Sequence, residues 1–315
     1  MAAIMEARGL KKYFKTRGGL LHAVDDVSFT IEGGTTLGVV GESGCGKSTL
    51  GRLLVHLLES TAGQILFDGR DVTHVNRAQL EALRRDVQLV FQDPYASLNP
   101  RKMVNETIAE PLVIEGRLNR REIAERVDQL METVGMDRRF LNAYPHEMDG
   151  GRRQRVGIAR ALALEPRFIV CDEPVSALDV SIQAQILNLM QDLQENRGLT
   201  YMFITHDLSV VKYIADEIMV MYLGQVVEKC GADELFEHTL HPYSQALLSA
   251  IPIPDIHAQK ERIILKGEIT SPVDPKPGCR FAARCAYAGA ACAQPQRLVE
   301  VGPGHWVACH RVQSV

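Results

Sequence analysis

The sequence predicts an α/β fold with an antiparallel β subdomain near the N-terminus, an inserted α-helical subdomain and a small cysteine-rich C-terminal tail. The core is predicted because short apolar strands alternate with amphipathic helices, which is typical of a parallel sheet. Between about residues 100 and 160 the pattern is entirely helical, which indicates an insertion. After about residue 250 prolines interrupt regular structure and four cysteines follow, which indicates a linker into a small tail.

The individual elements are predicted from hydrophobic periodicity and from turn residues. They are expected in this order: strands within 4–40, helix Lys47–Leu58, strand Gln64–Phe67, strand Val87–Phe91, helices Met103–Pro111, Arg120–Val134 and Arg152–Leu164, strand Arg167–Cys171, helix Ser181–Asn196, strand Thr200–Ile204, helix Asp207–Ala215 and a hairpin over Ile218–Glu228.

The composition argues against two classes of protein. The chain has 315 residues, with 35 Lys and Arg against 39 Asp and Glu, so it lacks the basic excess typical of nucleic-acid binders. No apolar run reaches the roughly 18 residues that a membrane span needs. The segment Met1–Leu10 has no continuous apolar stretch, so we expect no signal peptide. We therefore expect a cytosolic protein that reaches a membrane only through a partner.

One motif predicts binding of a polyphosphate and makes the core that of a P-loop NTPase. Residues 41–48 match G-x-x-x-x-G-K-[ST], between an apolar strand and an amphipathic helix. In this motif the glycines turn backbone N–H groups toward phosphates, Lys47 binds the β- and γ-phosphates, and the Ser48 hydroxyl binds Mg²⁺. The predicted nucleotide-binding residues of the loop are Gly41, Glu42, Ser43, Gly44, Cys45, Gly46, Lys47, Ser48 and Thr49.

Two acids at the end of a strand predict hydrolysis. The apolar run before Asp172 and Glu173 is a strand, so Asp172 is expected to hold Mg²⁺ through water and Glu173 to polarise the attacking water. The simpler alternative is a buried strand that ends in surface acids. Gln92 and His206 also follow predicted strands, and from there Gln92 could reach Mg²⁺ and the water, and His206 the γ-phosphate.

These motifs together resemble the nucleotide-binding subunits of ABC transporters over about residues 4–250. The likeness includes the phosphate loop, Gln92-Asp93-Pro94, Asp172-Glu173-Pro174, Ser176-Ala177-Leu178-Asp179 and Thr205-His206-Asp207, in the family's order. The resemblance implies that two subunits sandwich two ATP molecules and that Asp179 signals across their interface. It also implies an aromatic residue that stacks on adenine; Phe14 fits this position, with Tyr13 as the second choice.

Further segments are similar to the dipeptide/oligopeptide importer branch, whose members carry peptides, nickel or glutathione. These are Glu42-Ser43-Gly44-Cys45-Gly46, Tyr95-Ala96-Ser97-Leu98-Asn99-Pro100, Ile108-Ala109-Glu110-Pro111-Leu112, Tyr144-Pro145-His146-Glu147 and Cys279-Arg280-Phe281-x-x-Arg284-Cys285. The resemblance implies a C-terminal region over 251–315, two transmembrane permease subunits, an extracytoplasmic binding protein and a peripheral place on the cytoplasmic face of the membrane. The alternative is a soluble ABC ATPase of DNA repair or translation, which would usually carry a coiled-coil insertion or two fused motor halves.

The signature motif departs from the family. It usually reads Ser-Gly-Gly-Gln, but here it is Asp149, Gly150, Gly151 and Arg152. Asp149 would face the γ-phosphate held by the other subunit, and two like charges at about 4 Å repel by about 4 kcal/mol at an effective dielectric of about 20. We therefore expect a weakened site and a heterodimer with a second, related ATPase. The alternative is that Asp149 only caps the helix that follows.

Four cysteines in the tail predict a metal site. Cys279, Cys285, Cys292 and Cys309 could complete a zinc site or a [4Fe–4S] cluster, or could be free thiols. None of them forms the close C-x₂₋₄-C pair typical of zinc sites. The resemblance to the peptide-importer branch implies the iron–sulfur cluster, which we therefore expect in addition to ATP and Mg²⁺.

Overall fold

The computed structural model describes residues 2–251, 262–265, 267 and 270–313, which form two compact units. Unit 1 contains Glu32–Thr35 and Val75–Met202. Unit 2 contains Ala2–Ile31, Thr36–His74 and the described residues of Phe203–Val315. Strand β8 (Thr200–Ile204), which was predicted with these bounds, contains the boundary between them.

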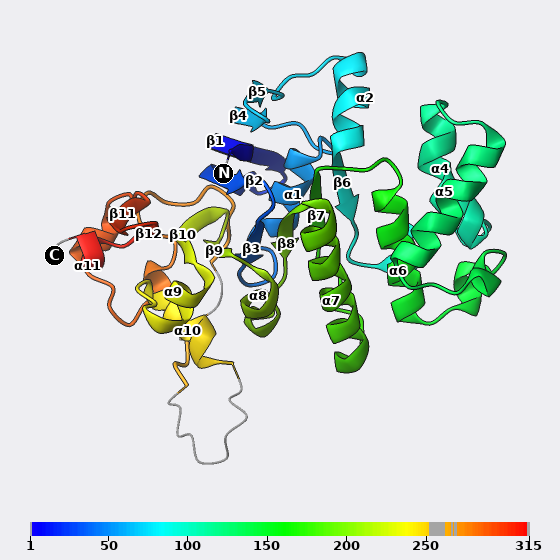
Figure 1. Cartoon of the computed structure of the whole chain (residues 1–315). Helices are drawn as coiled ribbons and strands as arrows, with labels where there is room; N and C mark the ends of the chain where they lie inside the picture. The colour runs from blue at the N-terminus through cyan, green and yellow to red at the C-terminus, as the bar shows by residue number, and fades with distance from the viewer. Residues whose placement is uncertain (1, 252–261, 266, 268–269, 314–315) are drawn as a thin grey trace, which may run out of the picture. The chain divides into compact units, whose positions relative to one another are not determined.

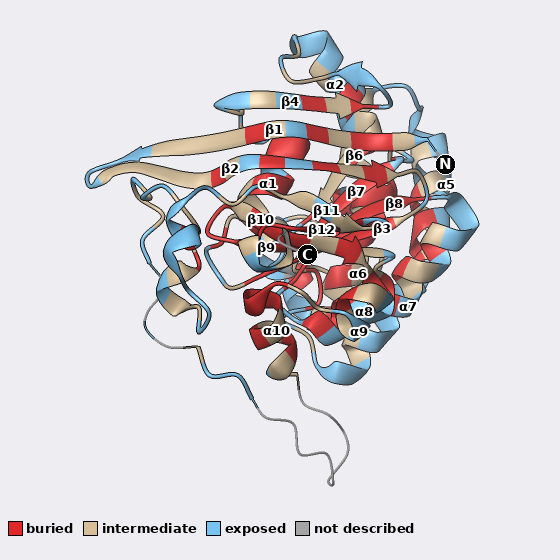
Figure 2. Cartoon of the chain, turned by 90° about the vertical axis from the view of Figure 1, so that its left-hand side faces the viewer, coloured by how far each residue is buried: buried red, intermediate tan, exposed pale blue. Residues whose placement is uncertain are grey.

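Unit 2 contains the predicted antiparallel subdomain. Its four strands are adjacent in the order β2–β1–β4–β5, and β1 pairs antiparallel with β4, with Met5 opposite Phe67. Within β1, residues 5–8 alternate between buried positions (Met5, Ala7) and more exposed ones (Glu6, Arg8), as expected for a sheet with one covered face (Figure 2). The bounds are β1 (Ala3–Thr16), β2 (Gly19–Glu32), β4 (Ala62–Phe67) and β5 (Arg70–Asp71).

A second set of strands in unit 2 contains parallel and antiparallel pairs. Strand β3 pairs parallel with β9, and all five residues of β3 are buried, as expected of a parallel strand covered on both faces. The predicted hairpin is confirmed, because β9 and β10 pair antiparallel around Leu223 and Gly224. Strand β12 then pairs with β10, and β11 with β12. The bounds are β3 (Thr36–Val40), β9 (Glu217–Tyr222), β10 (Gln225–Gly231), β11 (Val299–Gly302) and β12 (His305–Val307).

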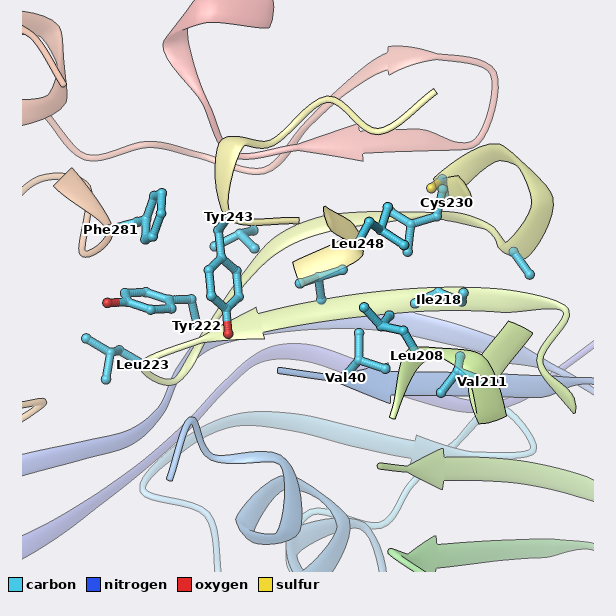
Figure 3. Packing of buried hydrophobic residues seen from close by; sticks show 14 residues of the cluster. Val40, Leu208, Val211, Ile218, Tyr222, Leu223, Cys230, Tyr243, Leu248 and Phe281 are labelled. Carbon is cyan, nitrogen blue, oxygen red and sulfur yellow. The ribbon is translucent and has the colours of Figure 1, made fainter. Parts of the chain in front are cut away.

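Several helices of unit 2 share one core with these strands. That core joins strands β3, β9 and β10 to α8, α9 and α10, and it includes Phe281 from the C-terminal tail (residues 270–313) (Figure 3). The helices and 3₁₀ turns are α1 (Lys47–Leu54), α8 (Leu208–Ile214), α9 (Ala232–Glu237), α10 (Pro242–Ser249), η3 (Ala282–Arg284), η4 (Ala290–Ala293) and α11 (His310–Gln313).

Unit 1 contains the predicted helical insertion, in which α4 and α5 lie side by side (Figure 1). Strands β6 and β7 pair in parallel, with Val87 opposite Phe168. Helix α4 continues through Pro111 to Glu115, beyond the predicted end. The bounds are α2 (Arg77–Asp86), β6 (Val87–Val90), α3 (Pro94–Ser97), α4 (Val104–Glu115), α5 (Arg120–Thr133), η1 (Arg138–Phe140), η2 (Pro145–Glu147), α6 (Gly150–Leu162), β7 (Phe168–Asp172) and α7 (Val180–Arg197).

The C-terminal tail packs on the strands of unit 2. Strand β12 extends the sheet beyond β10, and Phe281 is 2% exposed. Leu21 forms a bridge with Val273, so the tail also contacts β2. Pro252 and Pro254, predicted as the start of the linker, lie outside the described residues. Among the helices that the structure describes, none has both the length and the apolar composition needed to cross a membrane.

One buried ion pair fastens the tail to β10. The Glu228 carboxylate is fully buried and accepts hydrogen bonds from the N–H groups of Leu240 and His241. His305 Nε2 lies 2.9 Å from Glu228 Oε1, and this hydrogen bond raises the pKa of His305 above its ordinary value of 6.5.

A His305→Gln variant is expected to lose about 1.5–3 kcal/mol of stability, because the buried Glu228 carboxylate loses its charged hydrogen-bond partner. The raised pKa means that His305 gains a proton on folding, so its stabilisation is complete below about pH 6.5 and declines as pH rises through the folded pKa. The difference in thermal unfolding midpoint between parent and variant should therefore be larger at pH 6 than at pH 9. His238→Gln, in a pair that is 65% exposed at the histidine, is the matched control. Equal effects of the two substitutions would contradict this account.

Candidate functional site

The phosphate loop connects β3 to α1, and two of its glycines are required by close backbone contacts. Gly41 has φ 151° and Gly46 has φ 103°, in the region that favours glycine. A Cβ on Gly41 would lie 2.2 Å from the carbonyl oxygen of Met221, and one on Gly46 would lie 2.0 Å from that of Ala23. Any side chain at either position would displace the loop.

Lys47 stabilises the loop from within. Its side chain is 5% exposed, and Nζ donates to the carbonyl oxygens of Gly41 (2.7 Å) and Glu42 (3.1 Å). The loop therefore surrounds one buried positive charge at the N-terminus of α1, where the helix dipole adds to it. Ser48 and Thr49 lie in the first turn of the same helix. This arrangement is suited to a polyphosphate.

Two residues of unit 2 that the sequence analysis did not select hold Glu42. The hydroxyl of Tyr243 accepts a hydrogen bond from the Glu42 N–H (2.9 Å). The guanidinium of Arg284 forms an ion pair with the Glu42 carboxylate at 2.7 and 3.1 Å. Arg284 lies in the tail motif that resembles the peptide-importer branch, and that resemblance implies roles only for the cysteines. The one sequence signal for such a partner is Glu42 itself, because an acid in a phosphate-binding loop needs a cation to compensate its charge.

The two candidate adenine-binding aromatics differ in their surroundings. The ring of Tyr13 stacks on His22 with centroids 4.0 Å apart, and its hydroxyl donates to Asp25. Burial raises the pKa of Tyr13, and so does the bond to Asp25. Phe14 follows directly in the strand, so its side chain points to the opposite face, where Lys12 Nζ lies 5.1 Å from the ring centroid. Tyr13 is therefore committed to internal contacts.

His206 lies beyond β8 in unit 2. Thr205 donates its N–H to the carbonyl oxygen of Val39 (3.1 Å), next to the end of β3. His206 is exposed, and Asp207 caps α8 by accepting from the N–H of Ser209. The backbone therefore places His206 at the end of the sheet from which the phosphate loop begins.

Unit 1 brings two predicted catalytic residues together. Gln92 Nε2 donates to Glu173 Oε2 at 2.9 Å, across 81 positions of sequence. Glu173 follows β7 with φ 49°, an uncommon conformation for a residue other than glycine. Asp172, the last residue of β7, is 3% exposed. The turn in the backbone at Glu173 thus separates a buried carboxylate from one that is accessible to Gln92.

The signature residues form the N-terminus of α6. Asp149 is the N-cap and accepts from the N–H of Arg152 (2.8 Å), while the Arg152 side chain pairs with the Asp149 carboxylate. Helix α6 therefore begins at Gly150, two residues before its predicted start. A Cβ on Gly151 would lie 2.5 Å from Cγ2 of Ile182, so this glycine allows α6 to approach α7. Asp149 thus caps α6, and Arg152 offsets part of its negative charge.

Asp179 occupies the corresponding position on α7. It is the N-cap of this helix and accepts from the N–H of Ile182 at 2.9 Å.

The four tail cysteines give no support to the predicted [4Fe–4S] cluster or to zinc. Burial raises the pKa of Cys279 to about 11, with neighbouring thiols adding to the rise, and burial also raises the pKa of Cys309. Metal ligands must be thiolates, and burial of Cys279 and Cys309 opposes that charged form. Within the described residues, no group of three or more His, Cys, Asp or Glu side chains is arranged to hold a metal ion. Cys279, Cys285, Cys292 and Cys309 form no disulfide.

Comparison with known proteins places these features in a family context. The family model described as ABC transporter matches residues 24–176, and the model described as oligopeptide/dipeptide transporter, C-terminal region, matches residues 227–292. The chain is 51% identical over 318 residues to the oligopeptide transport ATP-binding protein AppF of Bacillus subtilis (strain 168), covering 98% of this chain and 97% of that protein. It is 49% identical over 317 residues to the dipeptide transport ATP-binding protein DppF of Haemophilus influenzae, covering 98% of this chain and 97% of that protein.

Solved structures show the same fold. The ATP-binding cassette MJ0796, in a dimeric post-hydrolysis state with ADP and Pi, is 28% identical with a TM-score of 0.67, covering 73% of this chain and 99% of that chain. The protein cbiO1 from Clostridium perfringens, part of the ABC transporter complex cbiONQ, is 28% identical with a TM-score of 0.68, covering 76% of this chain and 92% of that chain.

Proposed function

The chain belongs to the ABC transporter family, as the ATP-binding subunit of a dipeptide or oligopeptide importer, and we propose that it binds ATP through the loop Gly41–Thr49 and hydrolyses it with Glu173. The observation that carries the proposal is the buried ammonium of Lys47 inside a loop that only glycine can form at Gly41 and Gly46. The resemblance inferred from sequence is thus confirmed. The relatives reported above are transport proteins and a transporter cassette, which gives no support to the alternative in DNA repair or translation.

In the proposed reaction, ATP and water give ADP and phosphate. Glu173 accepts a hydrogen bond from the attacking water and acts as its general base. The contact with Gln92 fixes the direction of the Glu173 carboxylate. The exposed His206 would contact the γ-phosphate. Its position just beyond Thr205, at the end of the sheet where the loop begins, supports this role.

Mg²⁺ fits the oxygen donors that the chain offers. We assign it to Ser48, Gln92 and Asp172, because hard cations prefer hydroxyl, amide and carboxylate oxygens. The 3% exposure of Asp172 suits a carboxylate whose charge a bound cation would compensate. When bound, the ion would neutralise charge on the β- and γ-phosphates.

Phe14 is the residue that we assign to adenine. The proposal is supported by the contacts of Tyr13, whose ring and hydroxyl are both taken by neighbours in unit 2. A phenylalanine gives an aromatic face without a polar group that competes for a partner.

The assembly that we propose has the chain at the cytoplasmic face of a membrane, peripheral to two permease subunits that a binding protein supplies with cargo. In this proposal residues 4–250 form the nucleotide-binding domain and 251–315 the C-terminal region. The [4Fe–4S] cluster is left out of the proposal, because the thiols of the tail do not fit it.

The signature motif supports a heterodimer of two related ATPases. Asp149 introduces a negative charge where the family has serine, and it is 55% exposed in spite of its pair with Arg152. In the proposed assembly, the ordinary signature of the second subunit completes the site on the phosphate loop of this chain. The site that contains Asp149 would then be the weaker one.

A Glu173→Gln variant is expected to lower the ATPase rate of the assembled transporter by about 10²–10⁴-fold, because the water loses its general base. ATP binding should survive, since the loop is untouched. ATPase and transport rates are measured alongside equilibrium binding of Mg-ATP. Glu195→Gln, at an exposed position on α7, is the control. A variant that retains the parent's turnover would contradict the assignment.

An Asp149→Ser variant is expected to raise ATPase turnover several-fold, because it removes a charge of the same sign as the γ-phosphate while serine keeps the N-cap. An Asp149→Ala variant should in addition lose about 1 kcal/mol of stability, since alanine cannot accept from the Arg152 N–H. Turnover of the assembled transporter and thermal unfolding are the two measurements. Asp137→Ser, at the N-cap of η1, is the matched control. Unchanged turnover in Asp149→Ser would refute the weakened site.

A further inference from the structure

The phosphate loop contains an acid that opposes its proposed ligand. Glu42 is the second residue of the loop, and its side chain is 26% exposed. Its carboxylate belongs to the same short loop as Lys47, which is expected to bind the phosphates. A negative charge so close to a triphosphate repels it unless a cation compensates the charge.

The compensating cation comes from the C-terminal tail, 242 residues further along the chain. Nη1 of Arg284 donates to Oε2 of Glu42, and Nη2 donates to Oε1. This is the bidentate geometry that makes an arginine–carboxylate pair specific. The Arg284 side chain is only 9% exposed, so water weakens the pair less than it would at the surface. The hydrogen bond to Glu42 raises the pKa of Arg284 further, so the charge is permanent.

Aromatic packing fixes Arg284 in this position. Phe281, one helical turn before Arg284, is buried against Tyr222 and Tyr243, with ring centroids 5.3 Å away in both cases (Figure 3). The hydroxyl of Tyr243 holds the Glu42 N–H. The backbone and the side chain of Glu42 are therefore held by one connected cluster in unit 2.

A second arginine of the tail supports the opposite end of the loop. Arg280 donates to the carbonyl oxygen of Leu223 and to the carboxylate of Asp25. Gly224, which follows Leu223 in the turn between β9 and β10, donates its N–H to the carbonyl oxygen of Cys45 at 2.8 Å. The segment 280–284 thus contacts both Glu42 and the turn that supports Cys45.

We propose that Arg284 is a positioning residue for ATP binding, which neutralises Glu42 and holds the phosphate loop open to a triphosphate. The inference rests on the proposed role of the loop. It explains why an acid can stand in a phosphate-binding loop of this chain, and it makes ATP affinity depend on an ion pair with the tail.

The test compares the affinities of the full-length chain for Mg-ATP, Mg-ADP and adenosine, measured by equilibrium titration. Arg284→Gln is expected to weaken Mg-ATP binding about tenfold, because Glu42 is left without its cation. The loss should be smaller for Mg-ADP and absent for adenosine, since repulsion by Glu42 scales with the charge of the ligand. Arg284→Lys, which keeps the charge, should lose less than Arg284→Gln. Arg262→Gln, at an exposed position before the tail, is the control.

The double variant Glu42→Gln/Arg284→Gln separates charge from packing. It should recover most of the Mg-ATP affinity lost in Arg284→Gln, because the repelling charge is gone. Equal losses for Mg-ATP and adenosine, no recovery in the double variant, or unchanged affinity in Arg284→Gln would each overturn the proposal. If Arg284→Gln does not fold, Arg284→Lys and the double variant still give the comparison. A parent chain that binds no Mg-ATP would instead refute the proposed function of the loop.

Discussion

The backbone of the phosphate loop packs so closely on neighbouring strands that no side chain fits between them, and the remaining site depends on this constraint. Gly41 and Gly46 approach the carbonyl oxygens of Met221 and Ala23, and this approach sets the path of the chain between β3 and α1. Only along this path can the Lys47 ammonium bond to carbonyl oxygens of its own loop. The resulting cradle joins a fixed charge to the N-terminus of a helix, an arrangement that needs little reorganisation when an anion binds.

The C-terminal tail belongs to the support of this loop. Phe281 completes the core of unit 2, and burying a phenylalanine of this kind contributes about 3–5 kcal/mol relative to alanine. That packing places Arg280 and Arg284 against Asp25 and Glu42. Segments that were selected separately, as likenesses to a transporter branch, are thus joined by one ion pair. Burial favours the neutral thiol at Cys279 and Cys309, and within the described residues no group of side chains in the tail is arranged to hold a metal ion.

The sequence predicted the helices, strands and turns whose formation depends on residues close together in the chain. The strand Thr200–Ile204, the hairpin at Leu223 and the insertion were found because periodicity and turn residues are properties of short segments. Helix α2 was missed although Asn76 and Gln79 form a capping box, because its exposed residues leave almost no apolar stripe. The partners of Glu42 could not be predicted, since nothing local links a loop residue to an arginine 242 positions away. For the same reason Gln92 and Glu173 were chosen one by one, and their contact emerged only from the fold.

The most direct measurement is the affinity of the full-length chain for Mg-ATP after Gly46→Ala substitution, with Gly231→Ala as the control at a glycine whose added Cβ meets open space. The account predicts that the parent and Gly231→Ala bind Mg-ATP equally, whereas Gly46→Ala stays folded by thermal unfolding and binds at least about tenfold more weakly, because the Cβ would displace the loop. Binding by Gly46→Ala with the affinity of the parent would contradict the claim that this loop conformation creates the site.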